Sequence, residues 1–494
     1  MRTSGVLMHI SSLPGDSGIG TFGENAYSFV DLLYESGQTY WQILPLCPTS
    51  YGDSPYQSFS TFAGNPYFID LQTLEKQGYL DADEYKNVNW GDDPEKADYG
   101  LLYIERHKVF KKVQKHFFEN LPDGYDDFCE KNSFWLDDFA LFMAVKDEHS
   151  GKAFSEWEDA IRLREPKTLE KYRKKCKEQT DYYKMLQYLF FEQWGALKAY
   201  ANKKGIKFIG DLPIYVALDS SDVWSSPKQF MLDDDMRPIE VAGCPPDAFS
   251  KDGQLWGNPL YDWEYMKKDR YSWWINRIRE ALKMYDVVRI DHFRGFDSYY
   301  CIKAGSETAK EGVWRKGPGM DLFKALKEQL GKVPIIAEDL GFLTDSVRRL
   351  LKQSKFPGMK VLQFAFDSRE ESDYLPHNYT QNCVVYTGTH DNDTVLGWQK
   401  STKRADVRFA KKYMNCTRAS DLNNAMIRCA HSSVADTSII AMQDIIGLGG
   451  EARMNTPSTV GGNWQWRAQE KDLCSETFEK LHYYTKLYSR MRKD

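Results

Sequence analysis

The stretch Arg289-Ile290-Asp291-His292-Phe293-Arg294-Gly295 decides how this chain is interpreted. It follows a largely apolar run, residues 285–288, that is typical of a short buried strand. Arg289 and Asp291 are two residues apart, so on a strand their side chains point to the same face. Burying this pair is costly unless chemistry needs it, and the cation would keep the aspartate ionised, as suits a carboxylate nucleophile. A buried structural ion pair is the alternative, and the stretch alone does not decide between the two.

Length and composition favour a large α/β protein without a nucleic-acid or membrane partner. The 494 residues suffice for two or three domains or for one barrel with insertions. The net charge of −6 suggests neither nucleic acid nor an anionic membrane, and no apolar stretch approaches the roughly 20 residues that span a bilayer. The N-terminus runs directly into the first expected strand and leaves no room for a targeting peptide. Nine cysteines without C-x-x-C spacing favour reduced thiols, and hence a cytoplasmic protein, over disulfides or a zinc site.

Eight short β-rich segments recur along the chain, and most end in polar or charged residues. Several follow a helical pattern that a glycine closes, as in Met185–Lys204 before Gly205 and Asp321–Leu330 before Gly331. Such alternation indicates parallel βαβ units, and eight of them fit an α/β fold of the (β/α)8 TIM barrel type, whose active site lies at the carboxyl ends of the strands. The expected strands are Val6–Ile10, Tyr40–Leu46, Lys207–Asp211, Val287–Asp291, Pro334–Glu338, Lys360–Phe366, Val384–Asp391 and Ser438–Asp444.

Uneven spacing between these strands predicts two insertions in the barrel. The barrel is expected over 1–72 and 184–494, with a mainly helical insertion over 73–183 after the second strand. A loop-rich insertion over 217–270, after the third strand, is expected at the active-site face. Within it, residues 241–259 are rich in glycine and proline and are not expected to form regular structure. The residues after Asp444 suffice for a loop and a closing helix, so no C-terminal β-domain is expected.

Two further acidic segments lie at expected strand ends. Glu338 stands where an apolar strand meets a loop, and partial desolvation there would raise its pKa, as a general acid requires. Capping of the next helix is an alternative that suits Asp339 better than Glu338. His390 and Asp391 could bind sugar hydroxyls, although an isolated His-Asp pair is more often part of a turn. Two carboxyl groups about 5–5.5 Å apart would indicate a retaining glycosidic mechanism.

Other motifs do not indicate a cofactor or a metal. The G-x-G-x-x-G match at residues 18–23 lacks the strand and the acidic ribose ligand of a dinucleotide site. A Walker A sequence, an H-x-x-x-H pair and a G-x-S-x-G elbow are all absent from the sequence. We therefore expect an enzyme that needs neither cofactor nor metal.

The three acidic segments, in this order, resemble the amylomaltase (4-α-glucanotransferase, disproportionating enzyme) family of the α-amylase superfamily. The resemblance spans nearly the whole chain and includes the motifs Ser12–Gly15, Tyr51–Ser60, Ala63–Tyr67, Gly210–Tyr215 and Trp256–Tyr261. It implies a transferase that moves α-1,4-glucan segments from a donor to the 4-hydroxyl of an acceptor by retaining double displacement. Its partners would be α-1,4-glucans and maltooligosaccharides, with either a monomer or a dimer possible. An α-1,4-glucan hydrolase with the same carboxylates, or a non-catalytic glucan-binding protein, are the alternatives.

The resemblance also implies roles for individual residues. Asp291 would be the nucleophile, Glu338 the general acid/base, and Asp391 would hold the 2- and 3-hydroxyls of the reacting glucose, supported by His390 and Arg289. The remaining residues that the resemblance places along the glucan-binding cleft are Ser54, Tyr56, Asp211, Trp256, Asn463 and, in a covering loop, Phe249.

Overall fold

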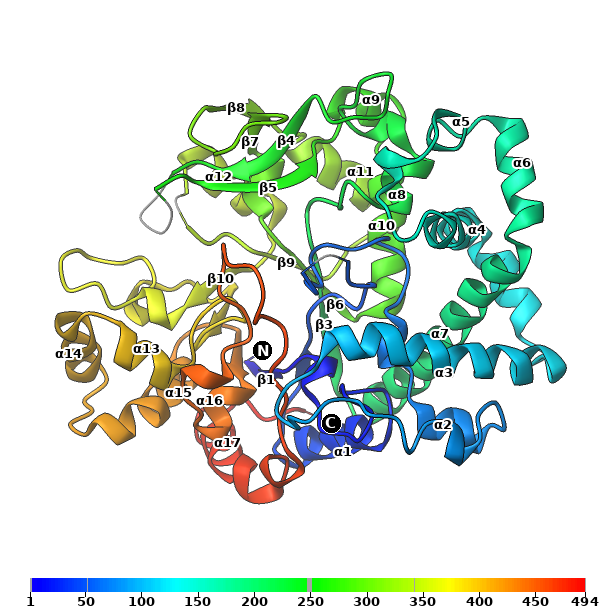
Figure 1. Cartoon of the computed structure of the whole chain (residues 1–494). Coiled ribbons are helices and arrows are strands. Elements are labelled where there is room, and N and C mark those ends of the chain that lie inside the picture. The colour runs from blue at the N-terminus through cyan, green and yellow to red at the C-terminus, as the bar shows by residue number, and fades with distance from the viewer. Residues whose placement is uncertain (1, 51, 247–250, 342, 494) are drawn as a thin grey trace.

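The computed structural model describes residues 2–50, 52–246, 251–341 and 343–493 (Figure 1). Its centre is an eight-stranded parallel sheet with the strand order β10-β11-β12-β1-β2-β3-β6-β9. The backbone N–H of Ala337 in β9 donates to the carbonyl of Pro357, just before β10, at 2.9 Å, so the two ends of the sheet meet. The strands are β1 Thr3–Leu7, β2 Tyr40–Gln42, β3 Lys207–Leu212, β6 Val287–Ile290, β9 Ile335–Ala337, β10 Gly358–Val361, β11 Cys383–Tyr386 and β12 Thr437–Ala441.

This arrangement confirms the predicted (β/α)8 barrel, because neighbours in the sheet follow one another along the chain. Each of the eight expected segments overlaps one strand, but several strands begin and end earlier than expected. β2 ends at Gln42 and β10 at Val361, whereas the apolar character continues further. The reason is that the connecting loops are themselves buried: Ile43 and Leu44 have at most 1% of their surface exposed. Apolar residues in these segments therefore indicate burial in the core and do not show where the strand ends.

Helices surround the barrel and bury one face each against it (Figure 1). Their ends carry ordinary capping signals: the Thr344 hydroxyl accepts from the Val347 N–H at the start of α12, and α11 ends at Gly331 with a φ of 73°. The barrel helices are α1 Glu24–Glu35, α7 Lys177–Lys203, α10 Ser272–Met284, α11 Met320–Leu330, α12 Asp345–Ser354, α13 Val395–Ser401, α14 Arg404–Tyr413, α15 Leu422–Ser432, α16 Met442–Ile446 and α17 Ser475–Leu487.

The long segment between β2 and α7 contains several helices, most of them after residue 98. It contains α2 Leu71–Lys76, α3 Tyr99–Glu119, α4 Tyr125–Glu148, α5 Asp159–Arg162 and α6 Pro166–Lys175. Buried residues of α3, such as Val109 and Phe110, belong to the same continuous hydrophobic core as Val6 of β1 and Ile290 of β6. The division into a barrel and an insertion stays a prediction, because one core runs through both.

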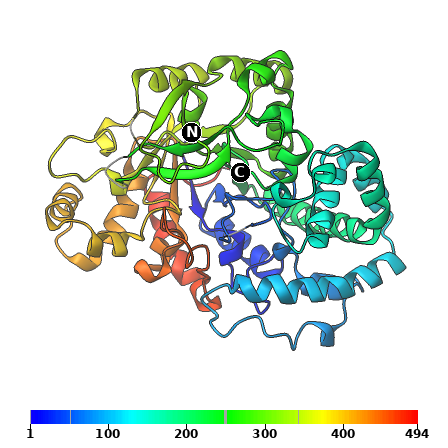
Figure 2. The ribbon, with the colours of Figure 1, turned by 45° about the horizontal axis from the view of Figure 1, so that its top comes forward.

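A second sheet, antiparallel with the order β5-β4-β7-β8, lies beside the barrel strands (Figures 1 and 2). Its strands are β4 Glu240–Cys244, β5 Gln254–Pro259, β7 Ser298–Lys303 and β8 Gly312–Lys316. The expectation that 241–259 has no regular structure is therefore wrong. β4 pairs with β7, a partner distant in sequence, and local glycine and proline content cannot reveal such a pairing. Gly243 allows both neighbouring strands to approach, since a Cβ there would lie 2.3 Å from the carbonyl oxygen of Gln254 in β5 and 2.4 Å from Cδ1 of Ile302 in β7.

Short elements complete the described chain: α8 Ser221–Ser225 and α9 Trp263–Lys268, and the 3-10 helices η1 Ile10–Ser12, η2 Pro66–Phe68, η3 Ala82–Glu84, η4 Phe154–Glu156, η5 Pro227–Gln229, η6 Phe293–Phe296, η7 Leu362–Phe364, η8 Pro376–Asn378, η9 Ala419–Asp421, η10 Gly450–Ala452 and η11 Glu470–Asp472. None of the helices in the described residues is both long and apolar enough to cross a membrane.

Candidate active site

The register of the barrel strands brings the predicted acidic residues together. Asp211 in β3 is the register partner of Arg289 in β6, and Ile290 in β6 is the partner of Ala337 in β9. Asp291 and Glu338 follow that second pair directly, on strands that lie about 4.8 Å apart. The Glu338 N–H still donates to the carbonyl of Ile290 at 3.0 Å, so the two acidic residues are neighbours at the carboxyl end of the barrel.

Arg289 lies between two carboxylates. Its Nη1 is 2.5 Å from Oδ2 of Asp211, and its Nη2 is 2.9 Å from Oδ1 of Asp291. The Tyr56 hydroxyl also donates to Oδ2 of Asp211, at 2.7 Å. Burial acts to lower the pKa of Arg289, but the charges of Asp211 and Asp291 outweigh it and raise that pKa well above its usual value. The guanidinium thus remains charged in a site where its side chain is only 3% exposed.

Asp211 and Asp291 differ in their access to solvent. The Asp211 side chain is fully buried, and burial raises its pKa against the opposing charge of Arg289. The Asp291 side chain is 30% exposed and is bonded to Arg289 through Oδ1. Asp211 is therefore placed to hold Arg289, whereas Asp291 is the carboxylate that a ligand can reach.

Glu338 is a half-buried acid held by backbone N–H groups. Its Oε2 accepts from the His292 N–H and its Oε1 from the Leu340 N–H, each at 2.7 Å. Burial, followed by the negative charge of Asp291, raises the pKa of Glu338 to about 8, although Arg289 and both N–H donors act in the opposite direction. Near neutral pH the carboxyl group is therefore largely protonated, as a general acid must be. The alternative of helix capping is wrong, because Thr344 caps the next helix, α12.

His292 has a strained backbone between these two carboxyl groups. Its φ of 52° lies in the left-handed region that few residues other than glycine adopt. This conformation accompanies the donation of its N–H to Glu338. Burial lowers the pKa of its imidazole to about 4, and the neutral ring meets the Trp256 ring edge-on, with centroids 4.9 Å apart. Trp256, a predicted binding residue, thus contacts the residue that comes directly after Asp291.

Asp391 is held by the two groups that flank it. Its Oδ2 lies 3.4 Å from Nε2 of His390, and its Oδ1 accepts from Nδ2 of Asn455 at 2.6 Å. Burial would raise the pKa of Asp391, but the charge and hydrogen bond of His390, together with Asn455, outweigh burial and hold that pKa below its usual range. In return, Asp391 raises the pKa of the His390 imidazole despite its burial. Asp391 is therefore ionised when Glu338 is protonated.

An aromatic wall connects the Asp391 side of the site with the Asp211 side. The ring of Tyr56 stacks on that of His390 with centroids 5.1 Å apart and an interplanar angle of 20°. Trp464 lies 5.7 Å from Tyr56 and 6.0 Å from His390. Flat aromatic surfaces of this kind pack against the C–H faces of sugar rings.

Two other predicted binding residues, Ser54 and Asn463, form hydrogen bonds within their own loops. The Ser54 hydroxyl accepts from the Tyr56 N–H at 3.2 Å and so shapes the turn that carries Tyr56. Asn463 bonds Thr456 and Thr459 within its own loop. Phe249 lies outside the described residues. The binding roles of these three residues stay predictions.

Sequence reasoning missed three residues near Asp391, namely Arg453, Asn455 and Trp464. Arg453 donates through Nη2 to the backbone carbonyl of Asp391 at 2.6 Å and through Nε to the carbonyl of Asn455 at 2.7 Å. No strand or helix pattern surrounds these positions in the sequence, and the partners of Arg453 and Asn455 at Asp391 lie more than 60 residues away. A local pattern could not have identified them.

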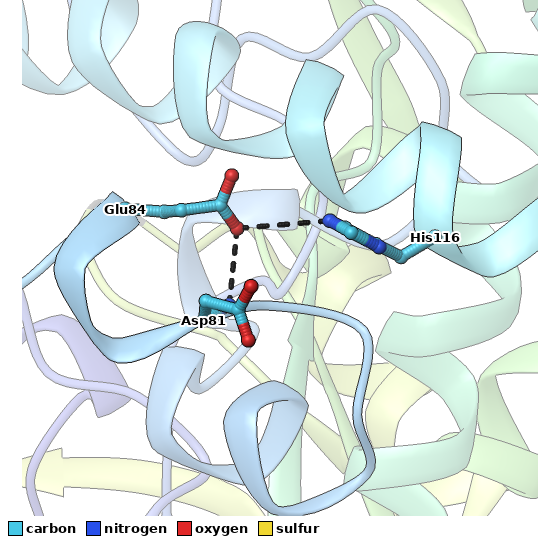
Figure 3. Close-up of side chains that lie close together, drawn as sticks. All are labelled: Asp81, Glu84 and His116. Atoms are coloured by element: carbon cyan, nitrogen blue, oxygen red, sulfur yellow. Dashed lines mark hydrogen bonds and ion pairs between the residues drawn. The ribbon is translucent and has the colours of Figure 1, made fainter.

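A possible metal-binding group exists elsewhere in the described chain (Figure 3). The ligand atoms of Asp81, Glu84 and His116 all lie within 4.8 Å of one another. Glu84 accepts from the Asp81 N–H at 3.0 Å, as part of a capping box at η3, and lies 3.9 Å from His116 of α3. Capping accounts for the two acidic residues without a metal. Among the described residues, no comparable group involves Asp291, Glu338 or Asp391.

Together, the barrel and its paired carboxyl groups define the class of protein: an enzyme of the (β/α)8 type that acts on glycosidic bonds. A family model described as 4-alpha-glucanotransferase matches residues 8–473, and the chain belongs to this family. The 4-alpha-glucanotransferase of Clostridium butyricum is 52% identical over 98% of this chain and 100% of its own, and that of Thermus thermophilus is 44% identical over 99% of each.

Solved structures agree with this assignment. The amylomaltase from Streptococcus agalactiae in complex with acarbose is 46% identical and superposes with a TM-score of 0.98 over 100% of both chains. The amylomaltase from Corynebacterium glutamicum, at 18% identity, has a TM-score of 0.80 over 99% of this chain and 75% of its own, and shares the fold. The expected family and fold are thereby confirmed.

Proposed function

We propose that this member of the 4-alpha-glucanotransferase family moves α-1,4-glucan segments through a covalent intermediate on Asp291, with Glu338 as the acid and then the base. The observation that carries the proposal is the adjacency of a half-buried carboxylate paired with Arg289 and a half-buried carboxyl group of raised pKa. Acarbose bound to the Streptococcus agalactiae relative supports a glucan-shaped cleft in this fold.

In the first half of the reaction, Oδ2 of Asp291 attacks the anomeric carbon of the donor. The bond from that carbon to the glycosidic oxygen breaks, and Glu338 transfers its proton to the departing oxygen. Arg289 donates to Oδ1 of Asp291 and leaves Oδ2 for the attack. The products of this half are a glucosyl ester on Asp291, a shortened glucan with a new 4-hydroxyl, and an ionised Glu338.

In the second half, Glu338 removes the proton from the 4-hydroxyl of an acceptor glucan. The resulting oxygen attacks the anomeric carbon, the ester bond breaks, and Asp291 recovers its charge with net retention of configuration. Esterification removes the negative charge of Asp291, which is one cause of the raised pKa of Glu338. The pKa of Glu338 therefore falls in the intermediate, so Glu338 is ionised when it has to act as a base.

Asp391 and His390 are proposed to bind the 2- and 3-hydroxyls of the reacting glucose. An ionised Asp391 accepts hydrogen bonds from both hydroxyls, and its charge stabilises the positive charge that develops on the ring. Tyr56 provides a flat surface beside them. These contacts strengthen as the ring distorts, so they favour the transition state over the ground state.

Incubation with maltotriose tests the proposal. The expected result is a chromatographic ladder of longer maltooligosaccharides together with free glucose, at a constant number of reducing ends. Replacing Asp291 with Ala should abolish turnover but leave acarbose binding intact. Shorter products alone, with reducing ends rising in step, would refute the transfer step and indicate hydrolysis. Full activity in D291A would remove Asp291 from the mechanism.

A further inference from the structure

The segment 453–464, called the strap here, crosses the carboxyl end of the barrel between α16 and α17, in the orange-red part of Figure 1. It is hydrogen-bonded to residues 390–391 through Arg453 and Asn455. Asn455 donates through its backbone N–H to the carbonyl of His390 at 3.1 Å and through Nδ2 to Oδ1 of Asp391. Arg453 donates to the carbonyls of Asp391 and Asn455, which ties the two segments together.

From this geometry we infer that Asn455 is a positioning residue for Asp391. Its amide fixes Oδ1 while His390 faces Oδ2, so the carboxylate has one orientation before substrate arrives. The Asp391 side chain is 44% exposed, and a carboxylate with that much freedom would otherwise sample several rotamers. The inference rests on the proposed function, because it concerns how Asp391 binds the hydroxyls of the donor glucose.

The strap has a second feature of a rigid support. Trp464 adopts a φ of 67°, an unfavourable conformation for a residue with a bulky side chain. It is held there by two hydrogen bonds of its backbone: its N–H donates to the carbonyl of Met454 at 2.7 Å, and its carbonyl accepts from the Tyr99 hydroxyl at 3.0 Å. Its ring then packs beside Tyr56 and His390. One end of the strap therefore supports Asp391 and the other supports the aromatic wall.

The electrostatic surroundings of Asp391 make a sharp test possible. Three cationic or ionisable donors face it from different elements: His390 on its own loop, Arg289 from β6, and Arg453 from the strap. Tyr56 and Asp211 are the other ionisable groups close to the Asp391–His390 pair. Asn455 is the neutral member of the set, and an aspartate has nearly the same shape. Asn455→Asp would place a second carboxylate where the amide now donates, 2.6 Å from Oδ1.

Two carboxylates at this distance cannot both ionise, so the pair would retain a proton to higher pH. In N455D the acid limb of kcat/KM should therefore move up by at least one pH unit. The alkaline limb, which requires a protonated Glu338, should stay in place. Asn455→Ala, which removes the amide and adds no charge, should lower kcat about 10- to 100-fold with a smaller change in KM, because a hydrogen bond to a charged group is lost.

The matched control is Asn382→Asp, which makes the same change of shape and charge on an exposed amide that bonds the carbonyls of Lys355 and Phe356. It should leave both limbs unchanged. Thermal melting of each variant establishes that it folds, and acarbose affinity at pH 5 and pH 7 gives a readout independent of turnover. The affinity of N455D should fall at least tenfold more than that of wild type between pH 7 and pH 5.

Several results would overturn the inference. A folded N455D with wild-type pH limbs and wild-type pH dependence of acarbose binding would do so, as would a folded N455A with kcat within twofold of wild type. These outcomes differ from failure of the proposed function, in which the wild-type enzyme itself would form no ladder from maltotriose. If N455D does not fold, the kcat of folded N455A alone tests the inference.

Discussion

Replacing Arg289 with Met removes the one guanidinium that bonds both Asp211 and Asp291. The larger consequence concerns Asp211, because its side chain is fully buried and its Oδ1 already lacks a hydrogen-bond partner. Breaking a buried ion pair by removal of one partner costs about 3–5 kcal/mol, since the other charge stays buried without compensation. We therefore expect R289M to lose about this much free energy of unfolding at neutral pH.

The expected shift in melting temperature follows from the size of the chain. An unfolding entropy of about 2.1 cal/mol/K per residue amounts to roughly 1 kcal/mol/K for 494 residues. A loss of about 3–5 kcal/mol therefore lowers Tm by about 3–5 °C. Calorimetry or circular dichroism at matched scan rates measures a shift of this size.

The pH dependence of R289M provides an independent check. Without the cation, burial raises the folded-state pKa of Asp211 further above its unfolded value. A group with a raised folded pKa favours folding at low pH and loses this contribution as pH rises through the folded pKa. The difference in Tm between wild type and R289M should thus widen from pH 5 to pH 8. The double variant D211N/R289M should recover most of the lost stability, because no uncompensated carboxylate remains buried.

An unchanged Tm for R289M at pH 8, with the variant folded, would refute this reasoning. The same holds if D211N/R289M is less stable than R289M, because the destabilisation would then not arise from the uncompensated charge of Asp211. Activity is expected to fall in both variants, since Asp291 loses its cation in each.

Three further predictions concern the acid, the strained backbone and the aromatic wall. Wild-type kcat/KM should fall above about pH 8, where Glu338 loses its proton, and E338Q should lower kcat about 10²- to 10⁴-fold and abolish this alkaline limb in pH–rate measurements. His292→Gly should keep the fold, whereas His292→Val should cost about 1–3 kcal/mol in denaturant unfolding, because a β-branched residue strongly disfavours a φ of 52°. Tyr56→Phe, which keeps the stack on His390 but removes the bond to Asp211, should lower stability by about 1–3 kcal/mol, and equal stability by the same measurement would contradict it.

How much of this molecule the sequence could predict depended on the range of the interactions involved. The barrel strands were predictable because they are short apolar runs, several of which lead directly into a charged or polar residue, as in Val287–Ile290 before Asp291. Parallel neighbours bring such ends to one rim, so Asp291 and Glu338 could be expected side by side. Here a local pattern and a general rule of topology were sufficient.

The parts that were missed depend on partners far along the chain. β4 contains Gly243 and precedes a proline pair, and it pairs on one side with β5 and on the other with β7, which lies much further along the chain. Asn455 lies in a loop without periodicity and gains its significance from Asp391, 64 residues earlier. In both cases the decisive interaction is absent from any window of sequence that surrounds the residue.

The three carboxyl groups of the site differ in protonation because each has a different partner. Arg289 pairs with Asp291, burial keeps the proton on Glu338, and His390 with Asn455 holds Asp391 ionised. Arg289 also bonds Asp211, whose Oδ2 accepts from Tyr56 as well, so the single guanidinium is shared between two of the carboxylates near the proposed donor glucose. These carboxylates stabilise a neutral sugar little, whereas they strongly stabilise the positive charge that develops on the ring in the transition state. Because these charges are fixed before substrate binds, the fold itself carries the cost of assembling them, and the left-handed backbone of His292, whose N–H donates to Glu338, is part of that cost.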